Sequence, residues 1–145
     1  MVTATVDDDV ISALVTASRA LIAISARSLA GVEDTLTLSE FRALVVLESQ
    51  GPATPISLAA HLDLGHGPTC RIVERIHDEE WVHFTSDGAY AVTSLGADLV
   101  ASVTRKRRLL IAEVTARMEA DERQALVDAL IAFARATGEP LAVEA

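Results

Sequence analysis

The fold is decided by residues 54–92, which read TPISLAAHLDLGHGPTCRIVERIHDEEWVHFTSDGAYAV. Thr54 followed by Pro55 is a typical helix start, because Thr caps free backbone N–H groups and Pro suits the first helical position. We expect this helix to end before Gly65 and a second helix to run from about Pro68 to Glu80, opened by its Gly-Pro pair. Two helices joined by a short turn that contains glycine match the helix-turn-helix motif. On the first helix the expected core-facing side chains are Ile56, Leu58, Ala59 and Leu62.

The second helix separates apolar from polar residues when its side chains are placed at ~100° per residue. The face turned to the core holds Thr69, Ile72, Val73 and Ile76. The opposite face holds Gly67, Cys70, Arg71, Glu74 and Asp78, with Arg75 at its flank. A helix with small, polar or basic residues on its outer face suits a DNA groove, because arginine can contact both phosphates and guanine. The sequence therefore predicts contacts with double-stranded DNA from His66, Gly67, Pro68, Cys70, Arg71 and Arg75.

These residues also have interpretations that do not involve DNA. Arg71 and Arg75 could instead form intrahelical ion pairs with Glu74 or Asp78. Cys70 is either a redox-sensitive thiol or simply a small residue that permits close approach. The four histidines of the chain lack the spacing of a metal-ligand pair, so we expect no zinc site.

Two short alternating segments follow, Val82–Thr85 and Ala89–Val92, on either side of Asp87-Gly88. An Asp-Gly pair in this position indicates a β-hairpin with a two-residue turn. A hairpin directly after a helix-turn-helix is a wing, and we expect Trp81 to fill the core at its base. The wing contains no Lys or Arg, and Asp87 at its tip would repel a phosphate backbone. An alternative therefore stays open, in which the fold is a protein–protein adaptor with weak or no DNA binding.

Long helices are predicted on both sides of this module. Val10–Leu29 is apolar on more than one face, and a helix of that kind is buried on most sides. Thr37-Leu-Ser-Glu40 forms a capping box, which starts a helix that ends near Gly51. After the hairpin, a long helix extends to Met118 and a last helix starts at about Asp121. Because a chain of 145 residues cannot easily surround so apolar a first helix, we expect a homodimer held by the first and last helices.

The predicted fold is mainly α with a small β-hairpin. It consists of a winged helix-turn-helix plus a helical dimerisation region formed by the N- and C-terminal helices. We assign residues 1–35 to a dimerisation helix and residues 36–95 to the winged helix-turn-helix. Residues 96–138 form the connecting helix and the C-terminal dimerisation helix, and residues 139–145 form a flexible tail.

Composition limits the functional classes. The single cysteine excludes an intrachain disulfide framework and fits a cytoplasmic protein. No apolar run reaches the roughly 18 residues that a membrane span needs, so we expect no membrane partner. No nucleophile–base pair, metal cluster or Gly-rich phosphate loop is visible, so we expect no enzyme and no cofactor. The net charge of −9 is unfavourable for DNA, although residues 41–76 are balanced between acid and base.

The order of these elements and several motifs resemble the MarR family of bacterial transcriptional regulators over nearly the whole chain. The motifs are Leu36-Thr-Leu-Ser-Glu-Phe41, Leu58-Ala59 to Leu62 with Leu64-Gly65, Arg71-Ile-Val-Glu-Arg75-Ile76, and Val92-Thr93-Ser-Leu-Gly96. The resemblance implies a ligand-responsive regulator, typically a repressor, that binds a pseudopalindromic operator as a homodimer. It also implies a small aromatic effector held between the dimer helices and the winged motif.

Two features depart from the family pattern, and a basic stretch is a separate candidate site. The family usually has Gly before the first wing strand, where this chain has Glu80, and it usually has a basic element in a longer wing. In the long helix after the wing, Arg105-Lys-Arg-Arg108 spreads four cations around one turn. Arg105 and Arg108 are candidates for binding an anionic effector, or the stretch is a solvated surface that offsets the acidic chain.

Overall fold

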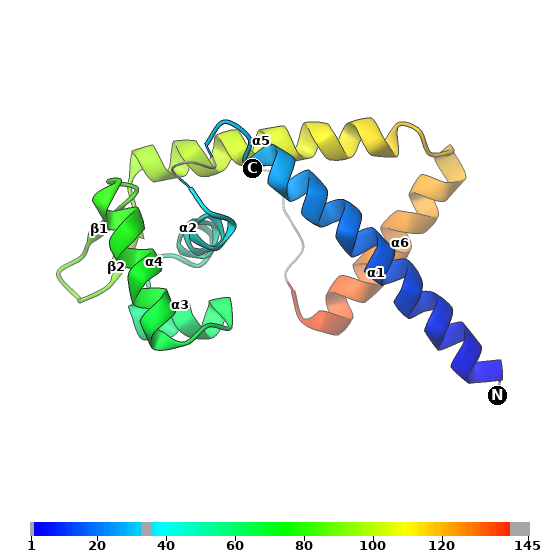
Figure 1. Ribbon diagram of the computed structural model, residues 1–145, viewed down its shortest axis with the longest axis horizontal. Coiled ribbons are helices and arrows are strands. Elements are labelled where there is room, and N and C mark those ends of the chain that lie inside the picture. The colour runs from blue at the N-terminus through cyan, green and yellow to red at the C-terminus, as the bar shows by residue number, and fades with distance from the viewer. Residues whose placement is uncertain (1, 33–35, 140–145) are drawn as a thin grey trace. The chain divides into compact units, whose positions relative to one another are not determined.

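The structure is a computed structural model that describes residues 2–32 and 36–139, with side chains from Asp8 onward. It contains eight elements in the order α1 (Val2–Ser28), α2 (Leu38–Gln50), α3 (Pro55–Leu62), α4 (His66–Asp78), β1 (Val82–Phe84), β2 (Tyr90–Val92), α5 (Ser94–Thr115) and α6 (Ala120–Thr137) (Figure 1). This confirms the predicted fold, mainly helical with one hairpin. Residues 140–145 of the predicted tail lie outside the described residues. The chain divides into two compact units, Met1–Arg108 and Leu109–Ala145, which we describe separately.

The helices of the first unit begin where local capping rules predict. The Thr37 hydroxyl accepts a hydrogen bond from the Glu40 N–H at 3.2 Å, and the Glu40 carboxylate accepts from the Thr37 N–H at 2.9 Å. The Thr54 hydroxyl accepts from the Ser57 N–H at 3.2 Å at the start of α3. Both caps satisfy backbone donors that a helix start otherwise leaves without partners.

The core of this unit lies among α2, α3, α4, the base of the hairpin and the first turns of α5. Its buried side chains are Leu29, Leu36, Phe41, Ala43, Leu44, Leu47, Leu58, Leu62, Val73, Ile76, Trp81, Val82, Val100 and Val103. The prediction for Trp81 is confirmed, whereas Ile56 is 74% exposed and does not pack α3 against the core. Ile56 is exposed because, at ~100° per residue, its side chain lies ~160° around the helix from the buried Leu58 and ~120° from the buried Leu62.

The wing has a different turn from the one predicted. β1 and β2 pair antiparallel, with Phe84 opposite Tyr90, and the Gly88 N–H donates to the Thr85 carbonyl at 3.2 Å. Among the loop residues only Gly88 has a left-handed φ, of +79°. A two-residue type I′ turn needs positive φ at both central positions, so the connection is a three-residue loop, Ser86-Asp87-Gly88, closed by a glycine bulge.

α1 is longer than predicted and is exposed over most of its described length, with Ile24 and Ser28 buried at its C-terminal end. By length and composition, Asp8–Ser28 could cross a membrane, so the expectation that no apolar segment reaches that length is wrong. One such helix is weak evidence, since helices of soluble proteins pass the same test. Val10, Ile11, Val15, Leu21 and Ile22 are all exposed in the single chain.

The second unit consists of the last turns of α5 and helix α6. The Glu119 N–H donates to the Glu122 carboxylate at 2.9 Å in a capping box that starts α6. None of the described residues of α6 is buried. Val127, Leu130 and Phe133 are exposed, and Leu126 and Ile131 are half-buried. The predicted homodimer, held by the first and last helices, would bury these side chains, and it stays a prediction.

Candidate nucleic-acid interface

α4 begins earlier than the sequence predicts. It runs from His66 to Asp78 with Gly65 as its N-cap, and no side chain caps it. The Gly67-Pro68 pair resembles the Thr54-Pro55 start of α3 and therefore predicted a start at Pro68. The start is set instead by the preceding helix, whose C-cap Asp63 takes a left-handed φ of 54° and turns the chain. His66 and Gly67 therefore lie in the first turn of α4.

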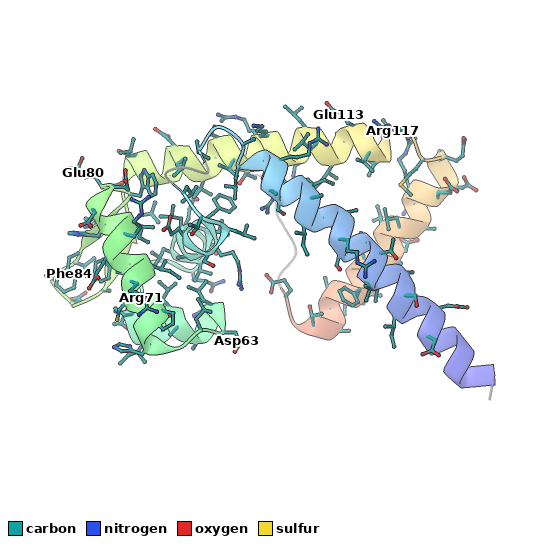
Figure 2. The ribbon with its side chains drawn as sticks, in the orientation of Figure 1. Asp63, Arg71, Glu80, Phe84, Glu113 and Arg117 are labelled. Carbon is teal, nitrogen blue, oxygen red and sulfur yellow. The ribbon has the colours of Figure 1, made fainter. Side chains whose placement is uncertain are left out.

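One face of α4 packs on the core and the other faces away from it. Thr69, Val73 and Ile76 are buried, and the Thr69 hydroxyl donates to the Gly65 carbonyl at 2.9 Å. Ile72 is half-buried. The exposed residues of α4 are His66, Gly67, Pro68, Arg71, Glu74, His77 and Asp78, and Cys70 is half-buried. Figure 2 labels Arg71 on this face. The face that the sequence predicted is thus the face that α4 leaves exposed.

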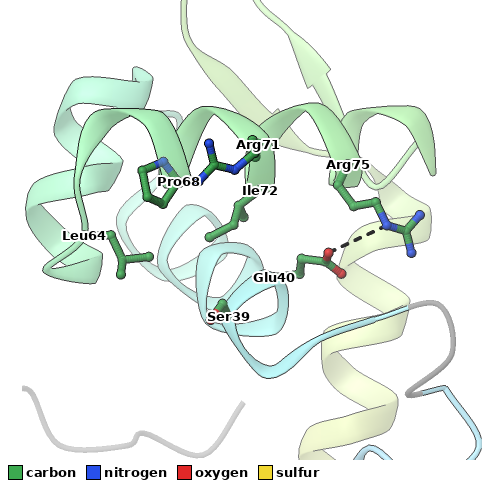
Figure 3. A pocket seen from close by; sticks show the side chains of 7 residues that line it. All are labelled: Ser39, Glu40, Leu64, Pro68, Arg71, Ile72 and Arg75. Carbon is green, nitrogen blue, oxygen red and sulfur yellow. Dashed lines mark ion pairs between the residues drawn. The ribbon is translucent and has the colours of Figure 1, made fainter.

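Arg75 lies at the edge of this face and is held by two carboxylates. Its Nη1 donates to Glu79 Oε1 at 2.6 Å, and its Nε lies 3.7 Å from Glu40 Oε1 (Figure 3). The hydrogen bond that Arg75 donates to Glu79 and the nearby charge of Glu40 raise the pKa of Arg75 above its ordinary value. Arg75 therefore forms ion pairs with Glu79 and Glu40, whereas the sequence offered Glu74 or Asp78 as its partners. The charge of Asp78 also contributes to the raised pKa. Glu40 lies on another helix, so no intrahelical spacing could have indicated it.

A cleft of about 400 Å³ opens between α4 and the start of α2. Its lining residues are Ser39, Glu40, Leu64, Pro68, Arg71, Ile72 and Arg75 (Figure 3). Arg71 and Arg75 are both part of this cleft, and Leu64, Pro68 and Ile72 are its apolar part. The cleft forms only where α2 and α4 are in contact, so no local sequence pattern indicates it. It could not have been found from the periodicity of α4 alone.

Cys70 lies beside His66, four residues earlier on α4, with its Sγ 3.5 Å from His66 Nε2. Both interpretations of this cysteine, as a thiol that senses oxidants and as a small residue, stay open. Among the described residues, no group of three or more His, Cys, Asp or Glu side chains could hold a metal ion.

The wing is joined to α4 by a strained residue and a tight packing contact. Glu80 has a left-handed φ of 62°, at the position where the family pattern has Gly. Its carbonyl accepts a hydrogen bond from the Thr93 hydroxyl at 2.6 Å, and the Trp81 carbonyl accepts from the Thr93 N–H at 3.0 Å. A Cβ on Gly96 would lie 2.2 Å from the Trp81 carbonyl oxygen. The wing is thus fixed to the start of α5 by backbone contacts.

The surface of the wing is aromatic and acidic. The ring of Tyr90 makes edge-on contacts with Phe84 at 5.1 Å and with His77 at 5.9 Å. Phe84 and Asp87 are both exposed (Figure 2 labels Phe84). The stretch from Val82 to Val92 contains no Lys or Arg, so the wing has no permanently charged cation to offer a phosphate.

The four cations of α5 have different environments. Lys106 Nζ donates to the Ala30 carbonyl at 2.8 Å, just beyond the end of α1. Arg107 lies over the Phe41 ring at 5.4 Å and is half-buried, and its burial lowers its pKa. Arg105 and Arg108, the predicted effector ligands, are exposed. Arg107 could have been found from the sequence, because it follows the buried Val103 at i+4 and so shares its face.

Comparison with known proteins gives matches among solved structures. No family model matches the chain, and no curated protein matches it significantly. The crystal structure of RV1404 from Mycobacterium tuberculosis is 42% identical, with a TM-score of 0.83 over 94% of this chain and 97% of that one. A MarR family protein from Bacillus stearothermophilus also has a TM-score of 0.83, at 19% identity, over 90% and 94%. The M. tuberculosis MarR family protein Rv2887, in complex with DNA, has a TM-score of 0.70 at 20% identity, over 84% and 95%.

An exposed helix after a short turn, followed directly by a two-stranded hairpin, defines a winged helix-turn-helix protein. The MarR fold extends over nearly the full length of the chain, and a relative is 42% identical over almost all of it. The chain belongs to the MarR family of winged-helix, DNA-binding transcriptional regulators. Regulators of this family are not enzymes.

Proposed function

We propose that this regulator is a cytoplasmic homodimer, a ligand-responsive repressor, that binds a pseudopalindromic operator in double-stranded DNA through α4 of each subunit. The observation that supports this most directly is the division of α4 into two faces. Thr69, Val73 and Ile76 fix the helix to the core, so its outer face with Arg71 is exposed and held in one orientation. Rv2887, which has the same fold, is in complex with DNA.

Arg71 is the main proposed contact. It is exposed, and among the described residues it is not one of those that form the ion pairs of α4. An arginine here can form a bidentate pair with guanine or bind a phosphate. His66, Gly67, Pro68, Cys70 and Arg75 complete the proposed contact set around the start and the flank of α4.

The test is Arg71→Ala, measured against an operator obtained by selection from random DNA. A bidentate base contact contributes about 1–3 kcal/mol, and the dimer has two, so affinity should fall at least roughly 30-fold. The melting temperature should not change, because the side chain is exposed. Arg117→Ala removes the same charge in the other unit and should leave affinity unchanged. Wild-type affinity in Arg71→Ala would mean that the recognition face is misassigned.

The homodimer is supported by the apolar residues that the single chain leaves exposed. α1 exposes Val10, Ile11 and Ile22, and α6 exposes Leu130 and Phe133. We propose residues 1–35 and 96–138 as the dimerisation region and residues 36–95 as the DNA-binding domain. A second copy would cover α1, which accounts for its apolar character without a membrane. Half-sites should then lie about 34 Å apart, or a multiple of that distance. A folded monomer at micromolar concentration, seen by light scattering, would contradict this part.

The proposed effector is a small aromatic or anionic molecule. Arg105 and Arg108 remain exposed candidates for its carboxylate. Arg107, between them, supports the proposal more strongly, because its buried Nε has no hydrogen-bond partner among the described residues. A buried donor without a partner is costly, and a carboxylate would remove that cost. A thermal-shift screen of small aromatic carboxylates, followed by operator binding with each hit, tests this part.

A further inference from the structure

Arg75 is a cation on the flank of the recognition helix whose charge is already compensated. Glu79 Oε1 accepts from its Nη1 at 2.6 Å, and Glu40 Oε1 lies 3.7 Å from its Nε. The group formed by these three side chains has a net charge of −1. Arg75 therefore presents no net positive charge to DNA while both contacts hold.

The two carboxylates differ in how firmly they are placed. The Glu40 side chain is 8% exposed, and its carboxylate also accepts from the Thr37 N–H in the capping box of α2. Glu40 is thus part of the junction between α2 and α4. The Glu79 side chain is 36% exposed, and Glu79 is the C-cap residue, one position past the last helical residue of α4. Glu79 is the partner that a competing anion can displace.

A competing anion has a place to bind. Arg75 and Arg71 are spaced i,i+4 on α4 and line the same cleft, with Ser39 of α2 across from them (Figure 3). The side chain of Arg75 is 39% exposed. Figure 3 shows the two guanidinium groups pointing apart, that of Arg71 toward Pro68 and that of Arg75 toward Glu40. A backbone phosphate beside the recognition helix could therefore be contacted by Arg75 from within this cleft, while Arg71 stays available for base contacts.

We propose that Glu79 lowers the affinity of this regulator for DNA by occupying Arg75, which otherwise binds a backbone phosphate in the cleft beside α4. This inference rests on the proposed DNA binding and assigns Glu79 as a positioning residue that acts through Arg75. Because a phosphate contact contains no sequence information, Glu79 weakens binding to all DNA by a similar factor.

The experiment compares wild type with Glu79→Gln in binding to the selected operator and to random DNA across a salt series. Each phosphate contact steepens the slope of log K against log salt by about 0.9, and the dimer gains two. Glu79→Gln should therefore bind both DNAs more tightly at low salt. Between 50 and 200 mM salt its affinity should fall roughly 12-fold further than that of wild type.

A double-mutant cycle separates this mechanism from simple repulsion between Glu79 and DNA. If Glu79 acts through Arg75, the effect of Glu79→Gln disappears in an Arg75→Gln background. Glu74→Gln is the matched control, because it removes the same charge from α4 without releasing Arg75, and its effect should persist in that background. If Arg75→Gln lowers the melting temperature, the cycle is repeated with Glu40→Gln added, which removes the unpaired buried carboxylate.

Two results would overturn the inference. One is an unchanged affinity and salt slope in Glu79→Gln, and the other is an effect that survives in the Arg75→Gln background. If the wild type binds operator and Arg71→Ala does not, such a result refutes only the role of Glu79. If the wild type binds no DNA in the selection, the proposed function fails and the inference fails with it.

Discussion

Replacing Gly96 by Ala tests the junction between the wing and α5. Gly96 is the third residue of α5 and is buried, and its N–H donates to the Thr93 hydroxyl at 3.1 Å. An added Cβ would lie 2.2 Å from the Trp81 carbonyl oxygen and 3.0 Å from Val92 Cγ1. Backbone atoms cannot rotate out of the way as a flexible side chain can. The start of α5 must therefore move away from Trp81, at the base of the wing.

The loss of stability in Gly96→Ala is the sum of three contributions. Forcing an extra carbon into a packed site costs about 1–3 kcal/mol. Moving the Trp81 carbonyl weakens its hydrogen bond with the Thr93 N–H, which contributes about 1 kcal/mol. Alanine inside a helix offsets about 0.5–1 kcal/mol of this. The free energy of unfolding should fall by about 2 kcal/mol, which lowers the melting temperature by roughly 4–8 °C.

The assay is thermal unfolding followed by circular dichroism at one fixed protein concentration, since a dimer melts in a concentration-dependent way. Gly67→Ala is the matched control: it lies in helix α4, and its added Cβ would meet Arg71 Nη1 at an ordinary 3.8 Å. Gly67→Ala should raise the free energy of unfolding by up to about 0.5–1 kcal/mol, and the melting temperature should rise with it. We therefore expect the melting temperature to fall in Gly96→Ala and to rise in Gly67→Ala. A melting temperature of Gly96→Ala at or above that of wild type would refute the reasoning.

Two further substitutions test the wing. Glu80→Gly should raise the free energy of unfolding by about 0.5–1 kcal/mol, measured as a higher urea midpoint. A left-handed residue with a Cβ costs about 1–2 kcal/mol, and the freedom of glycine in the unfolded chain offsets part of the gain. A lower midpoint would contradict this. Asp87→Arg should steepen the salt slope of DNA binding by about two units, one phosphate per subunit, since Asp87 is exposed and its φ is not left-handed. A folded Asp87→Arg protein with an unchanged slope would mean that the wing does not approach the duplex, and would favour the adaptor function.

The features that the sequence predicted well depend on residues close together in the chain. The capping box joins Thr37 to Glu40, three positions apart, and the cap of α3 joins Thr54 to Ser57. The faces of α4 follow from helical geometry once the helix is known to exist. These interactions leave a local pattern that sequence reasoning can use.

The features that the sequence predicted poorly depend on contacts between residues far apart in the chain or on backbone geometry. Arg75 pairs with Glu40 only because α2 and α4 pack together, and Arg107 lies over Phe41 because α5 packs on α2. The wing turn was predicted from its Asp-Gly pair, but that pair fits either a two-residue turn or a three-residue loop with a bulge. Which one forms is set by the strand register, in which Phe84 opposes Tyr90.

The distribution of charge has a consequence for how this regulator finds its operator. Non-specific affinity comes from cations that neutralise phosphates. On the proposed DNA face, Arg71 is exposed, the charge of Arg75 is compensated by two carboxylates, and the wing has no Lys or Arg. The acidic total charge of −9 further weakens attraction to DNA at long range. A regulator built this way has few phosphate contacts, so its operator affinity depends mostly on base contacts from α4. Its salt slope should accordingly be shallow, and its preference for operator over random DNA should vary little with salt.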